Sequence, residues 1–151
     1  MSKPKGALQE AVKLLSYRPR SVQEITLRLR HKKYPEEEIA EATNKLLDWG
    51  YLDDNKFAED WIQSRFLNKP MGSIRLREEL KLKGISTEII NFRLEEAFET
   101  VSEFEIALKL AYSKHTNKAN WNKTAGFLKM RGFSYSTIIS VREALGISRE
   151  W

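Results

Sequence analysis

Apolar residues recur at spacings of three and four along nearly the whole chain, which is the period of amphipathic α-helices. Near the beginning, Leu8, Ala11, Val12 and Leu15 form one such stripe. The stripe stops at Pro19, because proline disfavours the helical conformation of the residue before it. No stretch combines strict alternation of apolar and polar residues with β-branched enrichment. The sequence therefore predicts an all-α protein.

Two more helices are predicted before residue 50. Ser21 and Glu24 have the spacing of a capping box, in which each side chain satisfies a free amide at a helix start. Pro35, followed by three glutamates, predicts the start of a third helix that stops at Gly50. The expected buried face of this third helix consists of Ile39, Ala42, Thr43, Leu46 and Leu47.

The same order of three helices recurs twice, with Ser86 and Ser134 as expected caps of the later third helices. Shifts of 51 and then 48 residues bring the apolar positions into one register: Leu29, Leu80 and Leu128, and likewise Ile39, Ile90 and Ile138. In the turn after each second helix, Gly84 and Gly132 suit a left-handed backbone. Lys33, in the same register, must either bear the cost of a positive φ or end its helix differently.

Helices of about a dozen residues are marginal alone, so each unit must bury its stripes against its own partners and its neighbours. The sequence therefore predicts three tandem three-helix repeats, stacked into an elongated, curved helical array. We expect the repeats to span residues 7–52, 53–99 and 100–146.

Composition excludes several classes of protein. With 41% hydrophobic and 31% charged residues, the chain is typical of a soluble folded domain. No apolar run approaches the roughly 20 residues that cross a bilayer, and the first residues lack the apolar core of a secretory signal. We therefore expect no membrane association and a cytoplasmic location. The absence of cysteine excludes disulfides, thiolate nucleophiles and cysteine-type zinc sites.

Little in the sequence points to enzyme chemistry. Neither His31 nor His115 has a second metal ligand at helical spacing, and no nucleotide-binding or hydrolase motif is present. The adjacent carboxylates Asp53 and Asp54 suit a helix start better than a catalytic or magnesium-binding pair, because neighbouring residues of a helix do not face each other. We predict a protein that is not an enzyme, with no catalytic residue, metal, cofactor or small-molecule substrate.

Three tryptophans are candidates for stacking on nucleic-acid bases or for the core. Trp61 lies four residues from Phe57 and is expected in the core. Trp121, among asparagines, is expected to be more open, and Trp49 is left undecided.

Charge is distributed in blocks that alternate in sign, although the net charge is only +5. Every second helix carries two cations near its C-terminal end, in the same register in all three repeats. A solvated helix end that suits the helix dipole explains part of this pattern. Its threefold repetition also favours a polyanion or an acidic groove as partner. The candidate partner-binding or DNA-binding residues are Arg28, Arg30, Lys32, Arg75, Arg77, Lys81, Lys83, Lys123, Lys129 and Arg131.

The middle of the chain carries a more specific pattern. The run Gly-Tyr-Leu-Asp-Asp-Asn-Lys-Phe-Ala at 50–58 is followed by Trp61, Ser64-Arg65, Gly72, Glu79-Leu80 and Lys83-Gly84-Ile85. In order and spacing these elements resemble the RecX family of bacterial regulatory proteins, and the resemblance extends over about residues 7–146. Lys33 departs from the turn glycine of the later repeats.

The resemblance implies three tandem three-helix repeats and a non-enzymatic regulator of the RecA recombinase. Such a protein would lodge in the groove of the RecA filament on single-stranded DNA and restrain, mainly as an inhibitor, its ATPase, its growth and strand exchange in recombination and repair. DNA binding, to single strands and to duplexes, is also implied. The matched motif residues are expected to be caps, turns and core.

Two alternatives to this regulator stay open. One is an autonomous DNA-binding protein that uses the basic second helices. The other is an enzyme of unknown type, which no residue in the sequence supports. A monomer is expected. The terminal Trp151 has no counterpart in the repeat, so it is expected to pack on the third repeat or to contact a partner.

Overall fold

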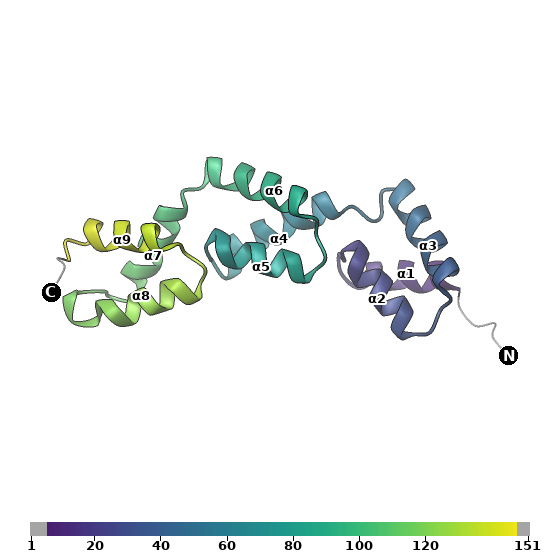
Figure 1. The fold of residues 1–151 in the computed structure, drawn as a ribbon, viewed down its shortest axis with the longest axis horizontal. Coiled ribbons are helices and arrows are strands. Elements are labelled where there is room, and N and C mark those ends of the chain that lie inside the picture. Colours follow the sequence, from purple (N-terminus) through teal and green to yellow (C-terminus); the bar gives the residue numbers. More distant parts are fainter. Residues whose placement is uncertain (1–5, 148–151) are drawn as a thin grey trace.

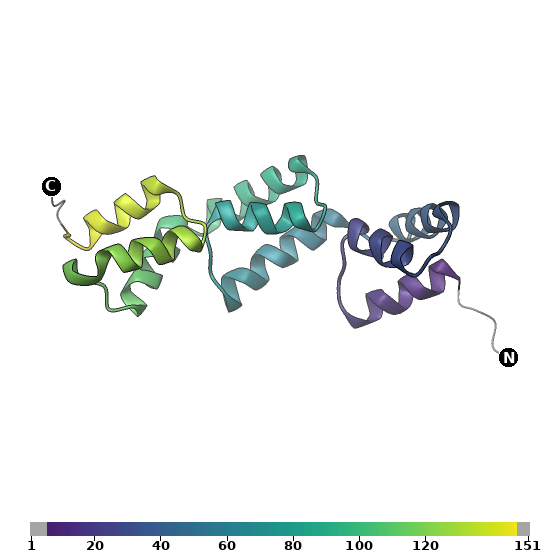
Figure 2. The same ribbon diagram turned by 60° about the horizontal axis from the view of Figure 1, so that its bottom comes forward.

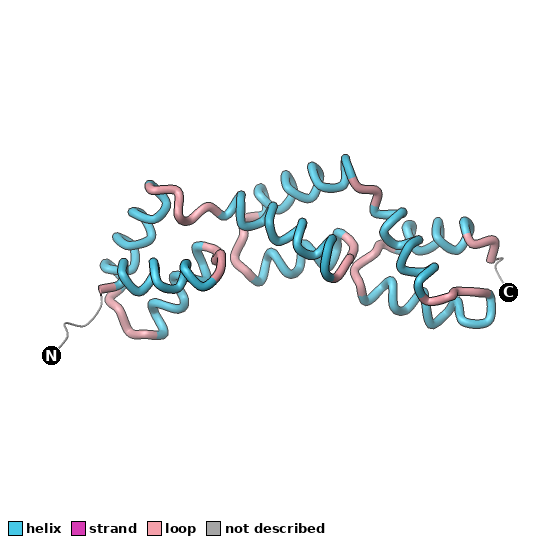
Figure 3. The backbone as a smooth tube through the Cα atoms, turned by 180° about the vertical axis from the view of Figure 1, so that it is seen from behind, coloured by secondary structure: helices cyan, strands magenta, loops and turns pink. Residues whose placement is uncertain are grey.

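The computed structural model describes residues 6–147, and this part of the chain contains nine α-helices, one short 3-10 helix and no strand. The α-helices form three groups of three that follow one another along a shallow arc (Figure 1). Figure 3 shows the same arc from behind, with one loop joining each group to the next. The predicted elongated, curved array of three-helix repeats is confirmed. The expectation for Trp151 lies outside the described residues.

We call the three groups the first, second and third units. The first unit consists of α1 (Ala7–Tyr17), α2 (Val22–His31) and α3 (Glu36–Asp48). The second consists of α4 (Asp54–Asn68), α5 (Ser73–Leu82) and α6 (Thr87–Thr100). The third consists of α7 (Glu103–Ser113), the 3-10 helix η1 (Lys118–Asn120), α8 (Trp121–Met130) and α9 (Tyr135–Ala144).

Side-chain caps start several helices where the sequence predicts them. Ser21 and Glu24 form the capping box of α2, with both reciprocal hydrogen bonds present. The side chains of Ser86 and Ser134 cap α6 and α9, and each accepts one hydrogen bond from a backbone amide of the first helical turn. Asp53 caps α4, so the first of the two adjacent carboxylates serves a helix start.

Each unit has a hydrophobic core of its own. The most closely packed helix pairs belong to a single unit, and the third helix of each unit packs against both of the others. Leu29, Leu80 and Leu128, which share one register, are all fully buried, each in the core cluster of its unit. The long-range order of the molecule therefore depends on the contacts between units, which are few and polar.

The turn after each second helix has the same geometry in all three units. Lys33, Gly84 and Gly132 adopt φ values of 67°, 79° and 86°, as the sequence predicts for a left-handed position. The amide of the next residue donates to the carbonyl five residues earlier, at 3.1 to 3.2 Å, which completes a Schellman motif. In the first unit a lysine bears the cost that glycine avoids in the other two.

Three apolar positions differ from the prediction. Helix α1 buries Ala7, Ala11 and Leu14, so Val12 is turned away from the core and is 47% exposed. Leu47 is likewise 42% exposed. Trp121, expected to be open, is 9% exposed, because it packs in the core cluster of the third unit at the start of α8.

Candidate functional site

The second helices α2, α5 and α8 form one continuous row along the molecule, which we call the second-helix row. They follow one another along the lower, inner side of the arc in Figure 1, and Figure 2 brings this side forward. The start of α2 contacts the turn after α5, and the start of α5 contacts the turn after α8. The predicted cations of the three repeats therefore lie on these three helices and the turns that follow them.

The junction between α5 and α8 is a direct contact of two backbones. The Gly72 amide donates to the Arg131 carbonyl at 2.7 Å, and the Ile74 amide donates to the Gly132 carbonyl at 3.1 Å. A Cβ on Gly72 would lie 2.3 Å from the Gly132 oxygen, so only glycine allows this approach. The free amides at the start of α5 thus satisfy the carbonyls that follow α8.

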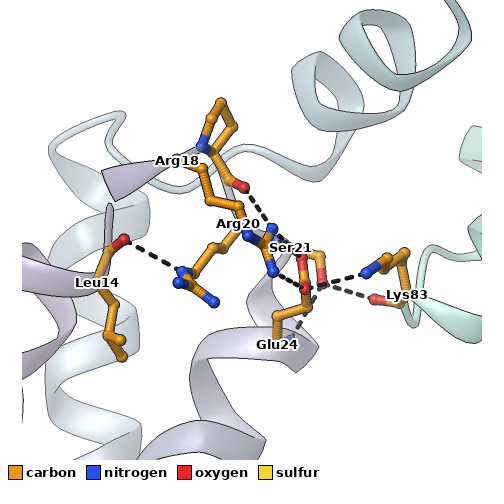
Figure 4. A network of polar contacts seen from close by, with 7 residues as sticks. Leu14, Arg18, Arg20, Ser21, Glu24 and Lys83 are labelled. Carbon is orange, nitrogen blue, oxygen red and sulfur yellow. Dashed lines mark hydrogen bonds and ion pairs between the residues drawn. The ribbon is translucent and has the colours of Figure 1, made fainter. Parts of the chain in front are cut away.

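The junction between α2 and α5 is made by side chains instead (Figure 4). The Ser21 hydroxyl donates to the Lys83 carbonyl at 2.6 Å, and the Lys83 ammonium donates to Glu24 at 3.2 Å. Arg18 donates to the same carboxylate at 2.7 Å. Lys83 also lies 5.2 Å from the centroid of the Trp61 ring, which completes a favourable site for its charge.

The starts of α2 and α5 are each stabilised by an acidic residue from the first helical turn of the following unit. The Val22 amide of α2 donates to Asp54 at 2.9 Å, and the Ser73 amide of α5 donates to Glu103 at 2.9 Å. A carboxylate at a helix N-terminus is favoured both by the free amides and by the helix dipole. The same kind of contact therefore links both pairs of neighbouring units.

The carboxylate of Glu24 is central to the first junction, and its environment favours the charged form. Burial raises its pKa, but hydrogen bonds from Arg18, the Ser21 amide and Lys83 outweigh that effect and hold the pKa of Glu24 below its ordinary value. Asp54 behaves oppositely: burial and the neighbouring Asp53 raise its pKa, although the hydrogen bond from the Val22 amide lowers it.

We expect Glu24→Gln to lower the free energy of unfolding by about 1 kcal/mol at neutral pH, because the ion pairs with Arg18 and Lys83 are lost. Since folding lowers the pKa of Glu24, its contribution is complete above the ordinary glutamate pKa of about 4.3 and is lost as the pH falls through the lower folded value. Urea titrations at several pH values measure this. The gap between variant and wild type should close in acid, and a gap that persists there would contradict the assignment.

Glu36→Gln is the matched control, since Glu36 is paired with Arg30 on the open surface. Its effect on the free energy of unfolding should be small throughout the titration.

The candidate cations fall into two sets. Six are exposed, and of these Arg30 is paired with Glu36 and Lys32 with Glu10. Within residues 6–147 the remaining four have no carboxylate at ion-pair distance: Arg28, Lys81, Lys123 and Lys129.

Three of the four half-buried candidates make contacts between neighbouring units. Besides Lys83, Arg131 donates to the Pro70 carbonyl at 2.7 Å and Arg75 donates to the Met130 carbonyl at 3.0 Å, both across the second junction. Arg77 donates to Asn91 at 2.5 Å within its own unit. The repetition of cations at Lys83 and Arg131 is therefore explained in part by contacts between units.

Exposed apolar residues beside the free cations were missed in the sequence. Leu82 is 80% exposed and Met130 is 75% exposed, and each directly follows a free lysine of the second-helix row. Trp49, left undecided above, is 55% exposed on the first unit. The alignment of the repeats contained the signal for Leu82 and Met130, because both lie between the two repeated cations.

Neither a cluster of metal ligands nor a membrane-spanning helix accompanies the second-helix row in the described residues. No three side chains of His, Cys, Asp or Glu gather as a metal site anywhere in residues 6–147. Among the helices described, none has the length and apolar character needed to cross a bilayer. What the row offers is a line of cations and apolar side chains on a rigid, elongated support.

Two family descriptions match about half of the chain. The description "RecX, first three-helix domain" matches residues 7–46, and "RecX, second three-helix domain" matches residues 53–91. The first match lies within the first unit, and the second lies within the second unit and ends inside α6.

Similar proteins agree with this assignment. The regulatory protein RecX of Chlorobium phaeobacteroides is 34% identical over 93% of this chain and 92% of its own length, and that of Vibrio vulnificus is 32% identical over 85% of each. The crystal structure of RecX from Lactobacillus salivarius superposes with a TM-score of 0.79 at 27% identity, covering 93% of this chain and 94% of the other.

Proposed function

The chain belongs to the RecX family of regulatory proteins, and we propose that it regulates the RecA recombinase, mainly as an inhibitor and without chemistry of its own. In this proposal it lodges in the groove of the RecA filament on single-stranded DNA and restrains ATP hydrolysis, filament growth and strand exchange. The observation that supports this best is the second-helix row, which presents free cations at intervals along an elongated arc.

A helical filament on DNA offers repeated acidic and apolar features along a groove. An elongated molecule with repeated contact residues fits such a partner, because each unit places the same face toward the next stretch of filament. Lys81 and Lys129 occupy equivalent positions in the second and third units, and each is followed by an exposed apolar residue. The row thus combines charge with apolar contact, as interfaces between proteins do.

A second candidate function is DNA binding without RecA. Residues 106–151 carry eight basic and two acidic residues. In this part Lys114 and Arg131 lie 4.1 and 4.8 Å from the Phe127 ring centroid, which gathers two cations around one aromatic side chain. If the four free cations contact phosphates, log K for single strands should fall against log salt with a slope of about −3. A slope near zero would remove this candidate.

We expect Lys81→Glu/Lys129→Glu to need at least about 10-fold more protein for half-maximal inhibition of RecA, because two attractive contacts become repulsive. The measurement is single-strand-dependent ATP hydrolysis by the cognate RecA, titrated with wild type and variant at fixed DNA. The wild type should inhibit well below the concentration that saturates the DNA.

Lys13→Glu/Lys109→Glu is the matched control, since it makes the same charge change on exposed lysines of the first helices α1 and α7. It should inhibit like the wild type, and both variants should keep their stability within about 1 kcal/mol. If the wild type acts only when it coats free DNA, the second candidate is favoured. Equal inhibition by wild type and row variant would move the contact away from the second-helix row.

A further inference from the structure

A cleft of about 680 Å³ opens between the first and second units, and its lining includes none of the exposed cations of the second-helix row. Its apolar lining comes from α1, from the end of α3 and from α4, and includes Leu15, Leu46 and Phe57, with the exposed Val12 and Tyr51 beside them. Val12 was expected in the core of the first unit, and its exposure is explained by this position.

The repeat itself shows why the cleft is open here. A shift of 51 residues aligns Leu15 with Phe66 and Arg20 with Met71. Phe66 packs against Phe98 with ring centroids 5.5 Å apart, and Met71 is fully buried in the core of the second unit. The larger and wholly apolar pair fills space in the second unit that a smaller leucine and a polar arginine leave accessible in the first.

The two junctions also differ in the groups that make the contact. Gly72 lets the second and third units meet backbone to backbone, whereas Ser21, at the aligned position, places a hydroxyl between α2 and the Lys83 carbonyl. The cleft thus lies beside the junction that a side chain bridges.

Arg20 lines the cleft and places a cation beside its apolar residues; Figure 4 shows its contact with Leu14. Its Nε donates to the Leu14 carbonyl at 3.1 Å, but within residues 6–147 it has no carboxylate at ion-pair distance, since Arg18 takes Glu24. Burial, together with repulsion from Arg18 and Arg28, lowers the pKa of Arg20 more than Glu24 raises it. A carboxylate from outside would relieve that repulsion.

The remaining lining argues against nucleic acid as the occupant. Asp53 and Asp60 lie on the cleft with Lys56, so the successive phosphates of a nucleic acid would meet negative charge as well as apolar side chains. An amphipathic protein segment can instead direct a single carboxylate to Arg20, away from Asp53 and Asp60, and an apolar side chain to the apolar lining.

We propose that this cleft is a docking site for a protein segment that carries an apolar side chain next to a carboxylate. The apolar side chain packs on Val12, Leu15 and Phe57, and the carboxylate pairs with the Arg20 guanidinium. The assignment of this segment to the recombinase filament rests on the proposed function. The kind of segment that the cleft would bind follows from the lining residues alone.

The direct test uses the full-length, ¹⁵N-labelled protein and the peptide acetyl-Glu-Leu-Phe-Glu-amide, followed by amide chemical shifts. Saturable shifts are expected near the cleft, at residues 12–20 and 50–57. Acetyl-Lys-Leu-Phe-Lys-amide and acetyl-Glu-Gly-Gly-Glu-amide each lack one half of the recognition, and each should bind at least about 10-fold more weakly.

Two variants separate the cleft from general effects. Leu15→Phe/Arg20→Met copies the residues of the second unit, so it should fill the cleft and abolish the shifts. Arg20→Gln leaves the cleft open and should lower the affinity for the acidic peptide by about 10-fold, to the affinity for the basic peptide. Circular dichroism checks that both are folded. No saturable shift in the wild type, or equal shifts in Arg20→Gln, would overturn the proposal.

The same variants in the RecA assay show whether the filament supplies the segment. We expect each to need at least about 10-fold more protein for half-maximal inhibition of ATP hydrolysis, while binding free single-stranded DNA like the wild type. If the wild type binds the peptide but does not inhibit RecA, the proposed function fails and the docking site stands. If the peptide does not bind, the docking site fails whatever the ATPase shows.

Discussion

Gly132→Ala is expected to lower the free energy of unfolding by about 2 to 4 kcal/mol, because it strains the turn and the junction together. Gly132 has a φ of 86°, which an L side chain rarely adopts. The new Cβ would also lie 2.3 Å from the Arg75 Cβ and 2.4 Å from the Arg75 amide nitrogen, in the neighbouring unit. Urea unfolding followed by circular dichroism measures the loss, and small-angle scattering should show a changed radius of gyration as the junction opens.

Alanine substitutions at two other glycines separate the cost of backbone strain from the cost of the steric clash at the junction. Gly50 has a similar φ of 78° but open space around its Cβ position, so Gly50→Ala should cost only the backbone strain, about 1 kcal/mol. Gly126 lies inside α8 with no contact and an ordinary φ, and Gly126→Ala should stabilise by about 0.5 to 1 kcal/mol. If Gly132→Ala costs no more than Gly50→Ala, the backbone junction contributes nothing to stability.

Leu80→Ala is expected to cost about 2 to 5 kcal/mol, as a large deletion in a close-packed core. Leu80 is fully buried in the middle unit, where Ile85 and Ile90 belong to the same core cluster. The Leu80 carbonyl also accepts the Schellman hydrogen bond from the Ile85 amide, so the residue contributes to both the core and the turn after α5. The same urea titration measures the loss.

Leu82→Ala is the control two residues away on the same helix. Leu82 is 80% exposed, so its removal should change the free energy of unfolding by less than about 0.5 kcal/mol. A cost for Leu80→Ala as small as that of Leu82→Ala would contradict the core assignment of the second unit.

Much of each unit could be predicted because its signals are local. The capping box at Ser21, the left-handed turn at Gly84 and the buried register of Leu29, Leu80 and Leu128 all depend on residues within a few turns of one helix. Helical period, cap and turn chemistry act over that distance, so they can be recognised in the sequence. The prediction for Trp121 was wrong because its polar neighbours in sequence did not indicate that it packs in the core cluster of the third unit.

The helices, their caps and the threefold repeat follow from contacts between residues close in the chain, so they could be predicted from the sequence. Which of the repeated cations are free depends instead on contacts between units. Lys81 faces solvent, whereas Lys83 binds Glu24, which lies 59 residues away in sequence. The cleft beside Arg20 is likewise lined by residues of two units. Contacts between units depend on the relative placement of whole helices, and no periodicity within one helix specifies that placement.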